Sequence, residues 1–322
     1  MNGGVKSGKT WRLLLLGIAV GGFAAWLVFA NTDVDGVLDI LQHKTDYLLA
    51  GAALLTYSLF FFGKALRWRY LLGPIVDVPP IKLTPYVLIG YAGNVLLPFQ
   101  AGEAARGLLL SKHHGVKAAA ALSGIALEKL LDFFALLLLL VWALWSLDVA
   151  SPVAEKVAVS LAGLLTLGAL ALAAILIRPA ATAAMIDWVL SYCPQAVASR
   201  LGTMIHDALD GLAALRQGTL IAKLLATSLA SWGVMLITLC LSLQAVQLEV
   251  PVAVAIVVLM LAAVGLALPT SPGFIGTLQA AFVLGMVPFG VDQEAAVAAS
   301  LLYQFLTTVP PLIAGGICLA RL

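Results

Sequence analysis

Long apolar runs separated by short polar intervals dominate the chain, and the lengths of these runs predict membrane-spanning helices. A crossing helix needs about 20 apolar residues, and runs of roughly this length cover 12–30, 47–63, 118–145, 157–177, 220–246 and 295–320. The first run exceeds the roughly 7–15 apolar residues of a signal peptide, which favours a retained helix over a cleaved leader. The pattern predicts an all-α polytopic membrane protein with about six full transmembrane helices.

Two further apolar regions are interrupted, and each half is too short to cross the bilayer comfortably. The sequence Pro98-Phe-Gln-Ala-Gly102 separates 81–97 from 103–113, and Pro269-Thr-Ser-Pro-Gly273 separates 252–268 from the apolar segment that continues to about 287. Because about 17 residues is the practical minimum for a crossing helix, we interpret 81–114 and 252–288 as re-entrant helical hairpins. Broken backbone at membrane depth must be buried in protein or line a wet cavity.

The distribution of positive charge predicts the orientation. Fourteen Lys and Arg residues lie on segments that this map places on one side of the membrane, whereas Lys44 and Lys156 lie on the other. Cytoplasmic loops carry the excess of Lys and Arg, so both termini are predicted inside. The first hairpin then enters from the cytoplasm. The second, flanked by Glu249, Asp292 and Glu294, enters from outside.

The order of spans and hairpins repeats with opposite orientation. Residues 1–150 comprise two spans, the cytoplasmic hairpin and a long span. Residues 151–322 comprise a span, a cytoplasmic amphipathic segment at about 178–218, another span, the outer hairpin and a final span. Both breaks contain Leu-Pro-x-x-x-Gly, at Leu97–Gly102 and Leu268–Gly273. Interrupted segments in matching positions of an inverted repeat point to a transporter's binding site near the bilayer midplane.

Composition excludes several classes of protein. The chain is 62% hydrophobic and 11% charged, with a net charge of +2, whereas soluble domains are about 45–50% apolar and about 25% charged. A soluble globule and a nucleic-acid binder with a basic patch are therefore excluded. The three cysteines are scattered, and His113 and His114 are adjacent, so on a helix they point in different directions. We predict neither a metal site nor a cofactor.

Five ionisable residues lie inside apolar segments, where each costs at least about 2.5–3.5 kcal/mol at the bilayer centre. They are Glu103, Arg106, Glu128, Lys129 and Asp132. Glu103 and Arg106 share a helical face, as do Glu128 and Asp132. Two interpretations remain open. One is a structural ion-pair cluster that holds the first hairpin to the next helix, and the other is a polar groove in which Arg106 and Lys129 face a lipid phosphate. Both can hold together.

Residues around the two breaks complete the candidate lipid-binding set. New helices are predicted to begin at Gly102 and at Ser271-Pro272, since Ser favours the N-cap and Pro the first turn. Helix N-termini attract anions. The polar side chains here either line the groove or satisfy the broken backbone. The candidate binding residues are Asn94, Gln100, Gly102, Glu103, Arg106, Glu128, Lys129, Asp132, Thr270, Ser271, Gly273 and Gln279; no residue is assigned a catalytic role.

Three motifs follow one another along the chain. They are Asn94-Val-Leu-Leu-Pro98-Phe-Gln-Ala-Gly102-Glu103-Ala-Ala-Arg106, Glu128-Lys129-Leu-Leu-Asp132 and Pro269-Thr-Ser271-Pro272-Gly273-Phe-Ile-Gly276. Together they resemble the motifs of the lysylphosphatidylglycerol synthase transmembrane-region family, which includes the flippase portion of the lysyl-lipid synthase/flippase proteins. The resemblance implies a protein that moves lipids or lipid-linked intermediates between leaflets.

The chain also departs from the family pattern. The family often has Arg at the positions of Gln100 and Lys129, and Glu at that of Gln279. The differences at Gln100 and Gln279 remove charge at the two breaks, so they bear on headgroup identity more than on architecture. The soluble aminoacyl-transfer domain of the bifunctional members has no counterpart in this sequence, so lipid synthesis is not expected.

The leading hypothesis is a flippase-like transporter in a cell membrane, most simply a bacterial inner membrane. A phospholipid or lipid-linked intermediate with an anionic or zwitterionic headgroup would pass through a polar midplane groove, because moving a charged phosphate through hydrocarbon carries a large desolvation cost. One alternative is a membrane-embedded headgroup transferase or hydrolase that uses Glu103 with His113 or His114. Another is a non-transporting partner of a lipid-modifying enzyme.

Overall fold

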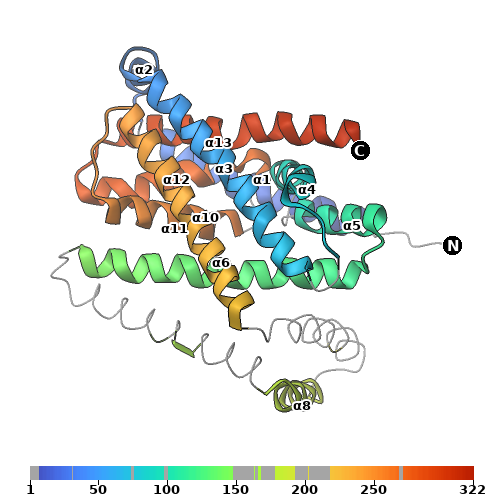
Figure 1. Ribbon diagram of the computed structural model, residues 1–322. Helices are drawn as coiled ribbons and strands as arrows, with labels where there is room; N and C mark the ends of the chain where they lie inside the picture. The colour runs from blue at the N-terminus through green and yellow to red at the C-terminus, as the bar shows by residue number, and fades with distance from the viewer. Residues whose placement is uncertain are drawn as a thin grey trace. The chain divides into compact units, whose positions relative to one another are not determined.

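The computed structural model describes residues 7–30, 32–73, 76–97, 101–147, 163, 166–167, 178–192, 202, 218–267 and 271–322. Every regular element within these ranges is a helix (Figure 1). By length and composition, four of the described helical segments can cross a membrane. They are Tyr47–Leu72, Thr219–Ala245, Pro272–Phe289 and Gln293–Arg321, and a fifth is formed if the bent pair Gly17–Phe29 and Val34–Lys44 is one span. The all-α, polytopic class is confirmed. The predicted span at 157–177 and most of the amphipathic segment at 178–218 lie outside the described residues, so the number of spans stays a prediction.

The N-terminal part of the chain folds into α1 (Ser7–Phe29), α2 (Val34–Asp39), a π-helical turn η1 (Ile40–Lys44) and α3 (Tyr47–Leu72). Asp33 caps α2 by accepting a hydrogen bond from the Asp35 amide at 3.1 Å. At the start of α3, the Asp46 side chain accepts a hydrogen bond from the Leu48 amide at 2.8 Å. Both caps satisfy backbone donors that a helix start leaves open.

The α3 helix is longer than the sequence pattern predicted. It continues past 63 to Leu72, because no helix breaker occurs before Gly73-Pro74. The sequence pattern ends this span at about 63 and places Lys64, Arg67 and Arg69 on a cytoplasmic segment after it. They instead lie within the helix.

The remaining elements follow the predicted order. The first interrupted region comprises α4 (Pro80–Leu96) and α5 (Ala101–His114), and the long helix α6 (Ala118–Ser146) follows. Beyond it lie α8 (Pro179–Leu190), which starts with Pro in its first turn, and α10 (Gly218–Ala245). The second interrupted region comprises α11 (Val252–Ala267), the 3-10 turn η4 (Pro272–Phe274), α12 (Thr277–Met286) and the 3-10 turn η5 (Val287–Phe289). The last helix is α13 (Gln293–Arg321).

Contacts divide the chain into two compact units. Unit 1 comprises Met1–Phe61, Val87–Ala105 and Gly233–Leu322, and unit 2 comprises Phe62–Tyr86 and Arg106–Trp232. The helices α3, α4, α5 and α10 each contribute residues to both units. These units are not the two halves of the predicted inverted repeat, 1–150 and 151–322. That repeat describes the order and orientation of the spans in a membrane, and it stays a prediction.

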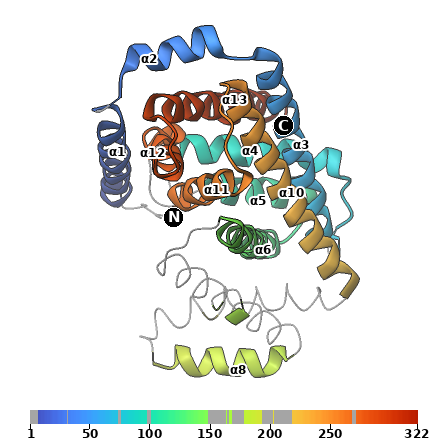
Figure 2. The same ribbon diagram turned by 90° about the vertical axis from the view of Figure 1, so that its left-hand side faces the viewer.

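Within unit 1, α11 and α12 form an antiparallel hairpin. A Cβ atom on Gly265 would lie 2.7 Å from Thr277, and one on Gly285 would lie 2.7 Å from Val258. As residue numbers rise on one helix they fall on the other, so the two helices run in opposite directions. Figure 2 shows this hairpin beside α13 and α1. The close approach depends on glycine, since any larger side chain at these two positions would separate the helices.

The α4 and α5 helices are also antiparallel. Near the break, a Cβ on Gly93 would lie 2.7 Å from the Gly102 Cα. At the far end, the Tyr86 hydroxyl lies 3.1 Å from His113 Nδ1. The two interrupted regions predicted from the sequence are therefore both helical hairpins, and whether they re-enter the same side of a membrane is a separate prediction.

Candidate functional site

A cluster of ionic side chains is buried within unit 2. Its members come from three helices: Lys64 and Arg67 of α3, Arg106 of α5, and Glu128 and Asp132 of α6. Arg67 and Glu128 are 0% exposed and Arg106 is 1% exposed, whereas the Asp132 side chain is 13% exposed. We call these five residues the ionic cluster.

Glu128 is at the centre of the ionic cluster. Its Oε1 lies 2.7 Å from Lys64 Nζ and 2.8 Å from Arg67 Nη2, and its Oε2 accepts a hydrogen bond from Arg106 Nη2 at 2.8 Å. The Arg106 guanidinium also lies over the ring of Trp68, 4.8 Å from its centroid. One carboxylate is therefore shared by three cations from two helices, and these short charge-assisted contacts offset part of its desolvation cost.

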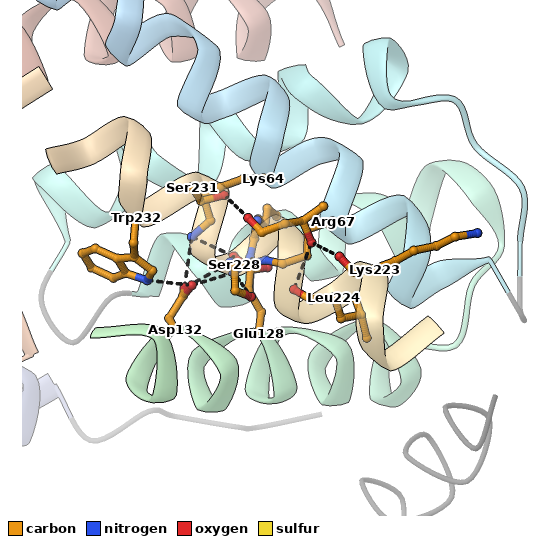
Figure 3. Close-up of polar contacts among 11 residues, drawn as sticks. Lys64, Arg67, Glu128, Asp132, Lys223, Leu224, Ser228, Ser231 and Trp232 are labelled. Atoms are coloured by element: carbon orange, nitrogen blue, oxygen red, sulfur yellow. Dashed lines mark hydrogen bonds and ion pairs between the residues drawn. The ribbon is translucent and has the colours of Figure 1, made fainter. Parts of the chain in front are cut away.

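Asp132 binds the other side of Arg67. Arg67 Nη1 and Nη2 donate to its two carboxylate oxygens at 2.6 and 3.1 Å, which is the bidentate geometry that Arg favours. Trp232 of α10 donates its indole N–H to Asp132 at 3.1 Å, and Ser228 accepts from Arg67 Nη1 at 2.8 Å. Figure 3 shows these side chains converging from α3, α6 and α10. The cluster therefore joins four helices of unit 2.

Residues four apart on a helix lie on the same face, and this spacing explains two pairs in the site. Glu128 and Asp132 are four residues apart on α6, as the sequence predicted, and Ser228 and Trp232 are four apart on α10. The pairing of Arg106 with Glu128 links α5 to α6, which is the structural link that the sequence left open as one alternative. Lys129 follows Glu128 on α6 and is half-buried.

Sequence reasoning missed four members of this site and its surroundings. Lys64 and Arg67 were assigned to a flanking cytoplasmic segment, and neither Ser228 nor Trp232 was singled out. The available signal was the absence of a helix breaker before Gly73, which leaves Lys64 and Arg67 three residues apart on one face of a continuing apolar helix. Such charges need buried partners.

At the first break, in unit 1, a candidate side chain caps the second helix of the hairpin. Asn94 Oδ1 accepts a hydrogen bond from the Glu103 amide at 3.1 Å, and Glu103 is half-buried. Gly102 is buried, and a Cβ there would overlap the backbone of Gly90 and Gly93. Asn94 thus satisfies broken backbone, which is one of the two roles predicted for the polar residues here. Gln100 lies outside the described residues.

At the second break, also in unit 1, two glutamines hold the backbone. Gln279 Oε1 accepts a hydrogen bond from the Gly276 amide at 2.7 Å. Gln279 Nε2 donates a hydrogen bond to Gln304 Oε1 at 2.5 Å. Gln304 of α13 in turn donates to the Gly273 carbonyl at 2.6 Å. Sequence reasoning had included Gly273 and Gln279 but missed Gln304, which lies 25 residues further along the chain.

The predicted start at Ser271-Pro272 is correct for a 3-10 turn but not for the longer helix that follows. Only the short turn η4 begins there, and α12 starts at Thr277 with Gly276 as its N-cap. The cause is backbone conformation: φ is +72° at Gly273, +63° at Phe274 and +83° at Gly276, and positive values cannot continue a right-handed helix. The Ser271 hydroxyl donates to the Ile275 carbonyl at 2.7 Å instead of capping a helix. Thr270 lies outside the described residues.

These features define a polytopic α-helical membrane protein with a charged cluster buried among its helices. The chain belongs to the lysylphosphatidylglycerol synthase transmembrane-region family, whose sequence model, described as "Lysylphosphatidylglycerol synthase TM region", matches residues 14–315. The match confirms the resemblance that the three motifs carry. No curated protein gives a significant match. Among the described residues, no group of three or more His, Cys, Asp or Glu side chains is arranged to hold a metal ion.

Proposed function

We propose that this protein moves a phospholipid or a lipid-linked intermediate between the leaflets of a cell membrane. Family membership supports a lipid-related role. The observation that carries the proposal is the contact of Glu128 with Lys64, Arg67 and Arg106 in the interior of unit 2. A lipid phosphate is an anion with the same kind of acceptor oxygens as a carboxylate, so these three donors suit both.

The proposed mechanism is an exchange of anions. Lys64, Arg67 and Arg106 hold the Glu128 carboxylate when no headgroup is present. A lipid phosphate that reaches the cluster replaces that carboxylate, and the protein donors take the place of the water that the phosphate gives up. The acyl or prenyl tails remain in the bilayer. Because the cluster is buried, this mechanism requires unit 2 to open, and rocking of inverted repeats is the general way in which such folds expose a site to each side.

Leaflet exchange in liposomes tests this proposal. Full-length protein is reconstituted with a phospholipid that carries a fluorophore on one acyl chain, and an impermeant reductant is added outside. Transport brings labelled lipid from the inner to the outer leaflet, where the reductant reaches its fluorophore. The fraction of fluorescence that survives the reductant therefore falls below that of empty liposomes. We expect this fall with the wild-type chain and no fall with Arg106→Ala.

A second variant separates a transport defect from a folding defect, since Arg106→Ala also leaves Glu128 with one cation fewer. The double variant Arg106→Gln/Glu128→Gln removes one charge of each sign, so the formal charge of the ionic cluster is unchanged. We expect the double variant to fold and to leave the inner-leaflet lipid protected. The control variant Lys44→Gln removes an exposed ion pair with Asp39, and we expect it to transport normally.

Normal exchange by the folded double variant would remove the ionic cluster from the mechanism. Mass spectrometry of the same lipids distinguishes the alternative functions. A chemically altered headgroup supports the membrane-embedded transferase or hydrolase. Neither exchange nor alteration supports a non-transporting partner of a lipid-modifying enzyme.

A further inference from the structure

Three exposed lysines surround the open end of the first hairpin, within unit 2. Lys82 lies in the first turn of α4, Lys112 in the last turn of α5, and Lys117 is the residue that precedes α6. All three side chains are exposed. We call them the basic rim, and neither the ionic cluster nor the proposed transport step uses them.

Aromatic contacts hold the ends of α4 and α5 that carry the rim beside each other. The Tyr86 hydroxyl lies 3.1 Å from His113 Nδ1, and the Tyr86 ring packs edge-on against His114 with centroids 5.8 Å apart. Lys82 lies one helical turn before Tyr86 and on the same side of α4. Since α4 and α5 are antiparallel, Lys82 faces the segment just after His114, where Lys117 follows.

Few carboxylates lie near the basic rim along the sequence. The sequence has no Asp or Glu between Asp77 and Glu103, or between Glu103 and Glu128. Asp77, the nearest acidic residue before the hairpin, is bound by Arg69 at 3.2 Å. The rim therefore has three positive charges on an exposed surface. Ile81 beside it is 68% exposed, so apolar and basic groups are adjacent, as they are on surfaces that lie at a membrane interface.

We propose that the basic rim binds the headgroups of anionic phospholipids at the membrane surface. The three lysines attract the negatively charged phosphates of such lipids, and the exposed Ile81 suits the upper part of their acyl chains. The positive charge of the three lysines sets the preference, because it repels the ammonium group that a zwitterionic headgroup carries beside its phosphate. This inference does not depend on the transport proposal, since a chain that moves no lipid can still bind one at this surface.

Native mass spectrometry of the delipidated full-length protein in detergent tests the inference. Phosphatidylglycerol and phosphatidylcholine, matched in acyl chains, are titrated separately, and the bound fraction is recorded for each. We expect tighter binding of phosphatidylglycerol by the wild-type chain. Each lysine near a lipid surface contributes about fivefold in affinity, so the triple variant Lys82→Gln/Lys112→Gln/Lys117→Gln loses about 100-fold.

Two control variants identify the cause of that loss. The triple variant with Arg at the same three positions keeps the charge and is expected to keep the preference, and Lys44→Gln is expected to bind as the wild type does. Equal binding of the two lipids, or undiminished phosphatidylglycerol binding by the glutamine variant, would overturn the proposal. Displacement of the lipid by millimolar inorganic phosphate would also overturn it, because the rim would then be a site for free phosphate. Leaflet exchange measured on the glutamine variant is a separate readout, and its loss or retention bears only on transport.

Discussion

Glu128 is the residue on which the ionic cluster depends most, because its carboxylate contacts all three cations and is fully buried. Glu128→Gln would leave these cations with Asp132 as the remaining carboxylate of the cluster. Breaking a buried ion pair by removing one partner costs about 3–5 kcal/mol. We therefore expect a clear fall in the thermal unfolding temperature, measured in detergent by intrinsic tryptophan fluorescence.

Asp132→Asn is the matched comparison for this prediction. The Asp132 side chain is 13% exposed, so water screens part of the charge that remains when its carboxylate is removed. Asparagine also keeps an oxygen that can accept from Arg67 and Trp232. A smaller fall in unfolding temperature is expected than for Glu128→Gln. An equal or larger fall would show that Asp132, and not Glu128, is the main anionic partner.

At the scale of the helix, the first hairpin depends on the absence of a side chain at Gly102. A Cβ there would overlap the Gly90 carbonyl oxygen and the backbone of Gly93, so Gly102→Ala must push α5 away from α4. We expect the unfolding temperature to fall and the Asn94 cap on the Glu103 amide to be lost. The cap is checked by faster hydrogen exchange at the start of α5.

Gly51→Ala is the control for this prediction, since a Cβ at that position in α3 would meet nothing within 4 Å. Alanine is favoured over glycine in a helix by about 1 kcal/mol, so this change is expected to leave the unfolding temperature unchanged or to raise it. If Gly102→Ala is tolerated as well as Gly51→Ala, the close packing of α4 on α5 is not needed for stability.

The sequence predicted the helices and the two hairpins better than it predicted the side-chain contacts between helices. Apolar length and the Pro and Gly residues at the breaks predicted both hairpins, because those signals are local. The partners of buried charges are not local: Arg67 meets Asp132, 65 residues away, and Gln279 meets Gln304 on another helix. The start of α12 was misplaced because Phe274 adopts a positive φ, which residue type alone does not indicate.

At the scale of the whole molecule, the lengths of the helices in the second hairpin bear on how it lies in the membrane. Pro272–Phe289 is long enough to cross, but its antiparallel partner α11 has only 16 residues, below the practical minimum of about 17 for a crossing helix. If α11 and α12 re-enter the same side, the residues before α11 and after η5 face one compartment. If η4, α12 and η5 together cross, these residues face opposite compartments.

Single cysteines at Glu249 and Asp292, both exposed, distinguish these arrangements in a chain whose three native cysteines are replaced. We expect an impermeant maleimide to label both positions in intact cells, since the scarcity of Lys and Arg around them predicts an outer location. Lys82→Cys and Lys117→Cys, at the open end of the first hairpin, should react only after the membrane is permeabilised. Labelling of Glu249→Cys but not Asp292→Cys in intact cells would mean that the second hairpin crosses, and the inverted repeat would then lose one of its two matching elements.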